Sequence, residues 1–181
     1  SGTVHLTDPD QAVEFVNRTK VDALAIAIGT SHGAYKFKAE PKLALDLAKK
    51  IHGMIPDTPL VMHGSSSVPQ DLIALVNRYG GKMPDAKGVP MSAIQSVIPF
   101  GVRKVNIDTD GRLAVTAAIR KVFAETPEKF DPRDYLGPAR EMLKTLVVQK
   151  MKDLGTAGHA DEFKAKSLAD MVAEYKKKGL L

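Results

Sequence analysis

The chain has 181 residues, with 26 Lys and Arg against 21 Asp and Glu, a net charge of +5 and no cysteine. A hydrophobic fraction of 44% over this length is typical of one globular domain or most of one, and excludes a disordered or collagen-like chain. The lack of cysteine excludes disulfides and thiolate zinc sites, so a metal would need His, Asp, Glu or carbonyl ligands.

Charge and hydropathy restrict the partners further. Trp is absent, aromatic residues make up 6%, and the densest basic run is Lys176–Lys178 at the chain's end, so we expect no nucleic-acid partner. No apolar run approaches the roughly 20 residues of a membrane span, and we expect no membrane partner. The first residues show no basic region followed by an apolar stretch, so a cytoplasmic location is expected.

Short apolar segments alternate with amphipathic ones through the first two thirds of the chain. Strands are expected at 21–28, 59–62 and 102–107, because these segments are apolar enough to be covered on both faces. Each expected strand lies next to a segment whose apolar residues recur at helical spacing. Helices are therefore expected at about 9–20, 41–53, 69–79, 90–98 and from 109 to 123. In three of these helices the apolar positions expected to face inward are Ala12, Val13, Phe15 and Val16, then Leu43, Leu47 and Ile51, then Val115, Ile119, Val122 and Phe123.

Three consecutive strand–turn–helix units predict an α/β fold with a parallel sheet. Three strands cannot close a barrel, which takes eight strands and about 250 residues, and they leave two open sheet edges. The chain is therefore expected to be either a small open sheet or a part of a larger fold.

The last fifty residues follow a different pattern. Apolar residues at helical spacing predict one long helix with a single apolar stripe, made of Leu143, Leu146, Val147, Met151 and Leu154. Residues 155–158 interrupt it, and a second helical pattern runs from Phe163 to Tyr175. The stripe would pack against a second subunit or, equally well, against the chain's own domain.

Two histidines follow the first two expected strands. His32 and His63 are each followed by glycine, and both would lie at the carboxyl edge of the sheet, where parallel α/β folds bind ligands. Neutral imidazoles there could bind Zn²⁺, although an open zinc site usually has three protein ligands. The alternative is a pair of loop histidines with ordinary hydrogen bonds. His5, His52 and His159 are interpreted as surface or packing residues.

Two segments are suited to bind a phosphate. The loop from Gly64 to Ser67 leads into a helix, and Asn106 to Asp110 does the same after the third strand, so both offer backbone N–H groups beside a positive helix end. Either loop could instead only cap its helix. Lys36, four residues after His32, and Arg133, placed just ahead of a helix, are candidate partners for an anion.

Four segments that follow in order resemble one known family. Residues 27–36, 60–67, 105–110 and 130–138 together resemble class II (zinc-dependent) fructose-1,6-bisphosphate aldolase, and residues 79–90 resemble its subtype from bacteria with a Calvin cycle. The family fold is a TIM (β/α)₈ barrel. The resemblance implies that residues 1–128 are the C-terminal half of that barrel, with strands six to eight, and that 129–181 form a helical extension.

The resemblance also implies roles for individual residues. His32 and His63 would bind zinc, Asn106 would contact the substrate's carbonyl region, and Arg133 would reach a phosphate of the neighbouring subunit in a homodimer or homotetramer. A potassium or sodium ion would lie near the carbonyls of Ser31, Gly33 and Gly64. The dihydroxyacetone-phosphate end would be held by Gly33, Gly64, Ser65, Ser66 and the backbone of Ile107, Asp108 and Thr109. Ser65 stands where many members have glycine, and this change keeps the N–H donor.

The implied reaction is the reversible, metal-dependent cleavage of fructose 1,6-bisphosphate to dihydroxyacetone phosphate and glyceraldehyde 3-phosphate, a step of glycolysis, gluconeogenesis and the Calvin cycle. The proton-transfer Asp and a third zinc-binding His would belong to the barrel's N-terminal half, so no catalytic proton donor is expected in this chain. Alternatives are a tagatose- or sedoheptulose-bisphosphate aldolase and a non-catalytic fragment that binds phosphosugars.

Overall fold

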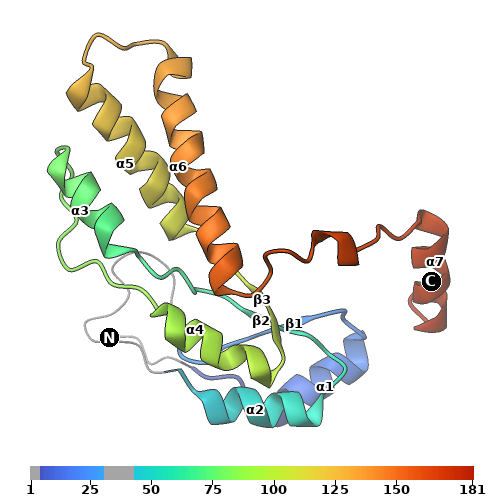
Figure 1. The fold of residues 1–181 in the computed structure, drawn as a ribbon. Helices are drawn as coiled ribbons and strands as arrows, with labels where there is room; N and C mark the ends of the chain where they lie inside the picture. Colours follow the sequence, from blue (N-terminus) through green and yellow to red (C-terminus); the bar gives the residue numbers. More distant parts are fainter. Residues whose placement is uncertain (1–4, 31–42) are drawn as a thin grey trace.

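The centre of the molecule is a three-stranded parallel sheet in the order β1-β2-β3. The computed structural model shown in Figure 1 describes residues 5–30 and 43–181. The strands are β1 (Leu24–Ile26), β2 (Leu60–Met62) and β3 (Val102–Val105). Met62 at the end of β2 pairs with Ile26 on one side and Val105 on the other, so the three strands end level. The expected α/β class with a parallel sheet is confirmed.

The outer strands are shorter than the sequence predicts. The apolar segments at 21–28 and 102–107 form ladders only over Leu24–Ile26 and Val102–Val105. Each outer strand can pair only along β2, which is three residues long. The surplus apolar residues are nevertheless used, since Ile28 is fully buried just beyond β1. Residues beyond the ladder thus begin the loops at the carboxyl edge.

Five helices and one 3₁₀ turn follow the βα pattern. They are α1 (Pro9–Thr19), α2 (Leu45–Met54), α3 (Gln70–Arg78), α4 (Met91–Val97), η1 (Ile98–Phe100) and α5 (Thr109–Glu125). Asp8 caps α1, since its carboxylate accepts the Gln11 N–H at 2.9 Å. Helix α2 begins later than predicted, at Leu45, and Leu43 is buried as a loop residue instead. Pro41, the expected start of α2, lies outside the described residues.

Two apolar clusters form the core. The larger one joins all three strands with α1, α2 and α4, and its fully buried members include Ile28, Ile51, Leu60, Met62 and Ile94. The second lies between α3 and α5 and consists of Val68, Ile73, Val76, Ala86, Leu113 and Ala117. Because Val68 belongs to the loop that follows β2, this second cluster anchors the loop between α3 and α5.

Two aromatic residues lie differently from the prediction. Phe15 of α1 is 50% exposed and Phe123 of α5 is 47% exposed, so neither is a core residue. Helix α5 is buried mainly through small side chains, namely Ala114, Ala117 and Ala118 beside Leu113, which let α3 and α6 approach it closely. Phe123 instead makes an edge-to-face contact with Tyr135 of α6.

The tail forms a helical hairpin with α5 and then a separate short helix. Helix α6 (Pro132–Asp153) runs back along α5, and η2 (Ala160–Glu162) and α7 (Leu168–Lys177) follow (Figure 1). The expected single stripe is only partly covered: Leu143, Leu146 and Leu154 are half-buried, whereas Val147 and Met151 are exposed. Phe163, expected within the second helical pattern, lies between η2 and α7 and is 79% exposed. None of the helices described could cross a membrane.

Candidate functional site

The carboxyl edge of the sheet brings His63 and Asn106 together. His63 follows β2, Asn106 follows β3, and the Asn106 Nδ2 atom lies 3.1 Å from His63 Nδ1 and 2.9 Å from Nε2. An amide N–H can donate only to a ring nitrogen that carries no proton. Asn106 therefore contacts His63 at a ring nitrogen that carries a lone pair, the kind of atom that a zinc ion would also use.

The loop after β2, residues 64–68, is joined to the start of α5. The Ser66 hydroxyl oxygen accepts the N–H groups of Asp108 and Thr109 at 3.2 and 3.1 Å. Ser65 is fully buried, and its hydroxyl turns back to the carbonyl oxygens of Met62 and His63 at 3.3 and 3.2 Å. The two predicted phosphate segments thus form one continuous surface at the sheet edge.

Backbone donors remain available on this surface. The N–H groups of Ser66 and Ile107 donate to no other group in the parts of the chain that the structure describes, and neither residue is fully buried. The Ser65 N–H has no acceptor there either, but Ser65 itself has no exposed surface. The Ser66 oxygen, which accepts two N–H groups, still has its own O–H to donate. Converging N–H and O–H donors at the start of a helix are suited to bind an anion.

A buried carboxylate that the sequence analysis did not single out supports this loop. Asp110, fully buried in the first turn of α5, accepts the N–H groups of Ser67 and Val68 at 3.0 and 2.8 Å and the Ser67 hydroxyl at 2.8 Å. The ammonium group of Lys150 on α6 lies 2.9 Å from the same carboxylate. An Asp at the start of a helix usually suggests an exposed first turn, and nothing local connects it to a lysine forty residues away.

Backbone packing also restrains the loop from the segment before α4. The Val89 N–H donates to the Ser66 carbonyl at 3.0 Å, and the Gln70 side chain donates to the carbonyls of Val68 and Ala86. A Cβ atom at Gly88 would lie 2.3 Å from the Ser66 carbonyl oxygen, so only glycine fits at this distance. The loop is therefore held rigidly from three sides.

Arg133 lies far from the site of its own chain. It is the second residue of α6 rather than a residue ahead of a helix, and it pairs with Asp131. The Arg133 guanidinium lowers the pKa of Asp131, and the carboxylate in turn raises the pKa of Arg133. Helix α5, 17 residues and so about 25 Å long, separates this end of the hairpin from the sheet edge (Figure 1). Arg133 is therefore too far from the sheet edge to contact an anion bound there in its own chain.

The metal site cannot be assembled from the described residues. His32, Gly33 and Lys36, with Ser31, lie outside them, and the ranges 5–30 and 43–181 contain no cluster of three His, Asp or Glu side chains. His63, exposed at the end of β2 and bonded to an amide, supplies one nitrogen ligand of the right kind. The Asp108 carboxylate pairs with Arg112 instead of facing His63.

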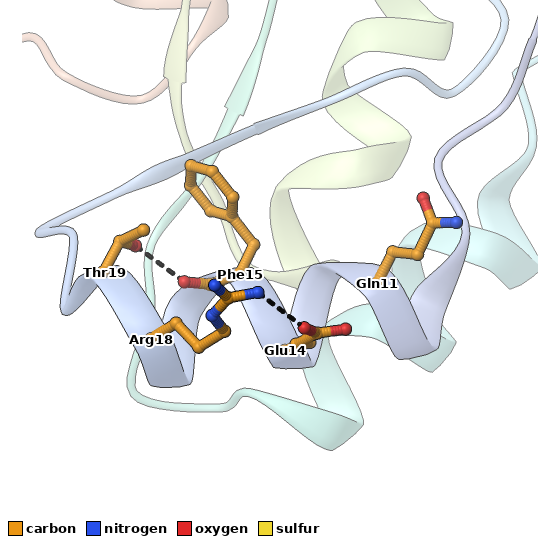
Figure 2. A pocket seen from close by; sticks show the side chains of 5 residues that line it. All are labelled: Gln11, Glu14, Phe15, Arg18 and Thr19. Carbon is orange, nitrogen blue, oxygen red and sulfur yellow. Dashed lines mark hydrogen bonds and ion pairs between the residues drawn. The ribbon is translucent and has the colours of Figure 1, made fainter.

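The remaining histidines and a surface hollow are separate from this edge. His52 packs against Gly101, and His159 pairs with Glu162. Figure 2 shows a hollow on α1 lined by Gln11, Glu14, Phe15, Arg18 and Thr19. Its charged groups pair with each other at 2.9 Å, and no strand-end residue lines it, so we do not assign it a role in the site.

Comparisons with known proteins identify the family of the chain. The family profile described as "Fructose-bisphosphate aldolase class-II" matches residues 1–159. The chain is 57% identical over 176 residues to a fructose-bisphosphate aldolase of Giardia intestinalis and 55% identical over 175 residues to one of Nostoc commune. The chain belongs to the class II fructose-bisphosphate aldolase family.

The chain is shorter than these relatives. The matches cover 96% and 95% of this chain but only 54% and 49% of the relatives, so the chain spans about half their length. The crystal structure of the YdjI aldolase from Escherichia coli K12 superposes with a TM-score of 0.62 at 29% identity, covering 85% of this chain and 46% of that one. A putative fructose-1,6-bisphosphate aldolase from Coccidioides immitis has the same score at 22% identity and supports the fold alone.

Proposed function

We propose that this chain is the C-terminal half of a (β/α)₈ barrel and that β1, β2 and β3 are its sixth, seventh and eighth strands. The relatives are about twice as long, and within residues 5–30 and 43–181 no further strand pairs with the outer edges of β1 and β3, which further strands of the same sheet would cover. In this proposal residues 1–128 form the barrel half and 129–181 a helical extension. The N-terminal half of the same barrel is then an obligatory partner.

The proposed activity is reversible aldol cleavage of fructose 1,6-bisphosphate to dihydroxyacetone phosphate and glyceraldehyde 3-phosphate. Family membership supports it, and members of this class are generally metal-dependent. The observation that carries the proposal is the sheet edge itself, where the His63–Asn106 pair lies beside a loop with unused N–H donors.

His63 and His32 are the proposed zinc ligands contributed by this chain. When bound, zinc supplies a Lewis acid that polarises the ketone carbonyl of the substrate. The Asn106 amide lies against the His63 ring and restricts its orientation. The proton-transfer Asp is assigned to the N-terminal half, so the residues of this chain bind and position the substrate.

The phosphate of the dihydroxyacetone end is assigned to the N–H groups of the two loops. Ser65, Ser66 and Ile107 supply the unused donors, and the rigid loop holds them in place with little reorganisation on binding. Gly33 and Gly64 complete the proposed donors, with Lys36 as a further cationic partner. The N–H groups of Asp108 and Thr109 donate to the Ser66 hydroxyl, and in this proposal they orient that hydroxyl toward the phosphate. A potassium or sodium ion is placed near the carbonyls of Ser31, Gly33 and Gly64.

Arg133 is assigned to a neighbouring subunit's phosphate in a homodimer or homotetramer. The distal position of Arg133 and its 90% exposed side chain support a role outside its own site. The exposed apolar side chains of α6, Val147, Val148 and Met151, support burial of this helix against a second subunit.

Cleavage by the complete polypeptide tests this proposal. We expect zinc-dependent cleavage of fructose 1,6-bisphosphate that is lost with EDTA, restored by zinc, and reduced by more than about 100-fold in His63→Ala, since loss of even an outer partner of a metal ligand typically costs about 10- to 100-fold. His159→Ala is the matched control, because His159 is exposed and pairs only with Glu162 on its own turn. Activity that survives EDTA, or that is equal in both variants, would contradict it.

A further inference from the structure

The strongest feature that the proposed chemistry does not use is the buried pair of Asp110 and Lys150. We propose that these two are positioning residues of the phosphate site: together they hold the loop after β2 in the conformation that presents the N–H groups of Ser65 and Ser66. The proposal rests on the phosphate site assigned above, and it adds a helix of the C-terminal extension to the binding machinery.

The carboxylate of Asp110 is fully buried, and each of its oxygens is bonded. Oδ1 accepts the Val68 N–H at 2.8 Å, and Oδ2 accepts the N–H and the hydroxyl of Ser67 at 3.0 and 2.8 Å. A charge is tolerated in such a place only when it is paired and hydrogen-bonded. All three of these donors belong to one loop, so the bonds of Asp110 fix the backbone of that loop.

The loop needs this restraint because of the conformation of Val68. Its φ of 52° lies in the left-handed region, which a β-branched residue such as valine rarely adopts. The Val68 side chain is buried in the cluster between α3 and α5, and its N–H is held by Asp110. The strained turn directly follows the proposed phosphate donors at Ser65 and Ser66, so its release would move them.

Lys150 balances the buried charge from the other side. Its side chain is 13% exposed, and its ammonium group lies 2.9 Å from Asp110 Oδ2 and donates to the Ser67 hydroxyl at 2.6 Å. Without this ammonium group the carboxylate would be a buried, uncompensated charge, and we expect it to turn toward solvent. The loop would then lose two backbone hydrogen bonds.

Whether Asp110→Asn strengthens or weakens phosphate binding shows whether Asp110 positions the loop or acts only through its charge. A carboxylate next to an anion site repels the anion, so if only charge mattered, Asp110→Asn would tighten phosphate binding. If Asp110 positions the loop, the same change weakens binding, because the amide cannot accept from both Ser67 and Val68 and balance Lys150 as well.

The test measures the affinity of the complete protein for inorganic phosphate by calorimetry. We expect Asp110→Asn and Lys150→Met each to weaken binding about tenfold, the equivalent of one charge-assisted hydrogen bond. The double variant should be no weaker than the worse single one, because the two residues act as a unit. Lys150→Arg should recover most of the affinity. Lys152→Met, which removes an exposed charge from the same end of α6, is the matched control and should lie within twofold of wild type.

A second readout applies if Asp110→Asn does not fold. Hydrogen exchange at the Ser67 and Val68 amides should accelerate in Lys150→Met and remain unchanged in Lys152→Met. The proposal would be overturned by tighter phosphate binding in Asp110→Asn or by equal losses of affinity in Lys150→Met and Lys152→Met. Unchanged hydrogen exchange at Ser67 and Val68 in Lys150→Met, or a wild-type protein that binds no phosphate, would overturn it as well. Phosphate binding without aldol cleavage would instead contradict the proposed reaction and leave this inference intact.

Discussion

At the scale of single residues, the amide–imidazole contact of Asn106 and His63 makes a prediction about metal affinity. With zinc on one ring nitrogen, the Asn106 amide can support the ring only by turning its oxygen to accept the other ring N–H, as outer partners of metal-bound histidines do. Asn106→Ala removes this acceptor and should weaken zinc binding about 10- to 100-fold. Competition with a chromogenic chelator measures this in the complete protein, independently of catalysis. Asn17→Ala, an exposed change on α1, is the control, and equal zinc affinity in both variants would show that Asn106 does not support His63.

A glycine outside the proposed site controls the loop through close packing. Gly88→Ala places a methyl group 2.3 Å from the Ser66 carbonyl oxygen and 2.5 Å from the Ser67 carbonyl carbon, so the backbone must shift. We expect a loss of about 1–3 kcal/mol in the free energy of unfolding, together with weaker phosphate binding. Denaturant titration measures the first effect.

Gly53→Ala in α2 is the matched control for this change. A Cβ atom there meets nothing within 4 Å, and alanine favours helix over glycine, so we expect a gain of up to about 1 kcal/mol. If Gly88→Ala were as stable as Gly53→Ala, the close contact between residue 88 and the loop would not exist in solution.

At the scale of elements, α7 is attached to the rest of the chain by polar contacts at Asp22. The Tyr175 hydroxyl donates to Asp22 at 2.8 Å, and Lys178 pairs with the same carboxylate. Lys178 and then Tyr175 lower the pKa of Asp22 below its usual value. The contribution of this contact is therefore complete above about pH 4 and is lost as the pH falls further and Asp22 takes up a proton.

The matching experiment follows the Tyr175 ring signals by NMR. Acidification below about pH 4, or Asp22→Asn at neutral pH, should shift these signals toward those of an exposed tyrosine, and 1 M salt should weaken the contact as well. Asp57→Asn, an exposed change near the same surface, should have no such effect. Signals that are insensitive to both changes would mean that other contacts hold α7.

The elements also show what sequence patterns can and cannot predict. The alternation of apolar strands and amphipathic helices predicted the parallel sheet, and strand-end positions predicted that Asn106 and His63 lie at one edge. The length of β1 and β3 could not be predicted, because it is set by their partner β2.

The Asp110–Lys150 pair joins residues forty positions apart through the packing of α6 on α5, and no local pattern signals such a contact. The inward faces of α1 and α5 were misassigned at Phe15 and Phe123 because amphipathicity alone does not reveal how closely neighbouring helices approach.

At the scale of the whole molecule, the open sheet edges make a prediction about these 181 residues alone. Among the residues that the structure describes, no further strand pairs with the outer edge of β1 or β3, and large apolar side chains such as Phe130, Phe163 and Leu168 are about 80–90% exposed. Expressed without the proposed N-terminal half, the segment should be poorly soluble and associate, which light scattering detects. A monomeric segment that melts cooperatively would contradict the assignment to half of a barrel.

The proposed reaction requires a metal ion and a sugar phosphate to bind side by side at the carboxyl ends of β2 and β3. The most direct measurement is a crystal structure of the complete polypeptide with zinc and dihydroxyacetone phosphate, with data collected at the zinc absorption edge. We predict an anomalous peak about 2.0–2.1 Å from a His63 ring nitrogen. The phosphate should lie within hydrogen-bonding distance of the Ser65 and Ser66 N–H groups. A zinc peak away from His63, or a phosphate bound outside the loop after β2, would contradict it.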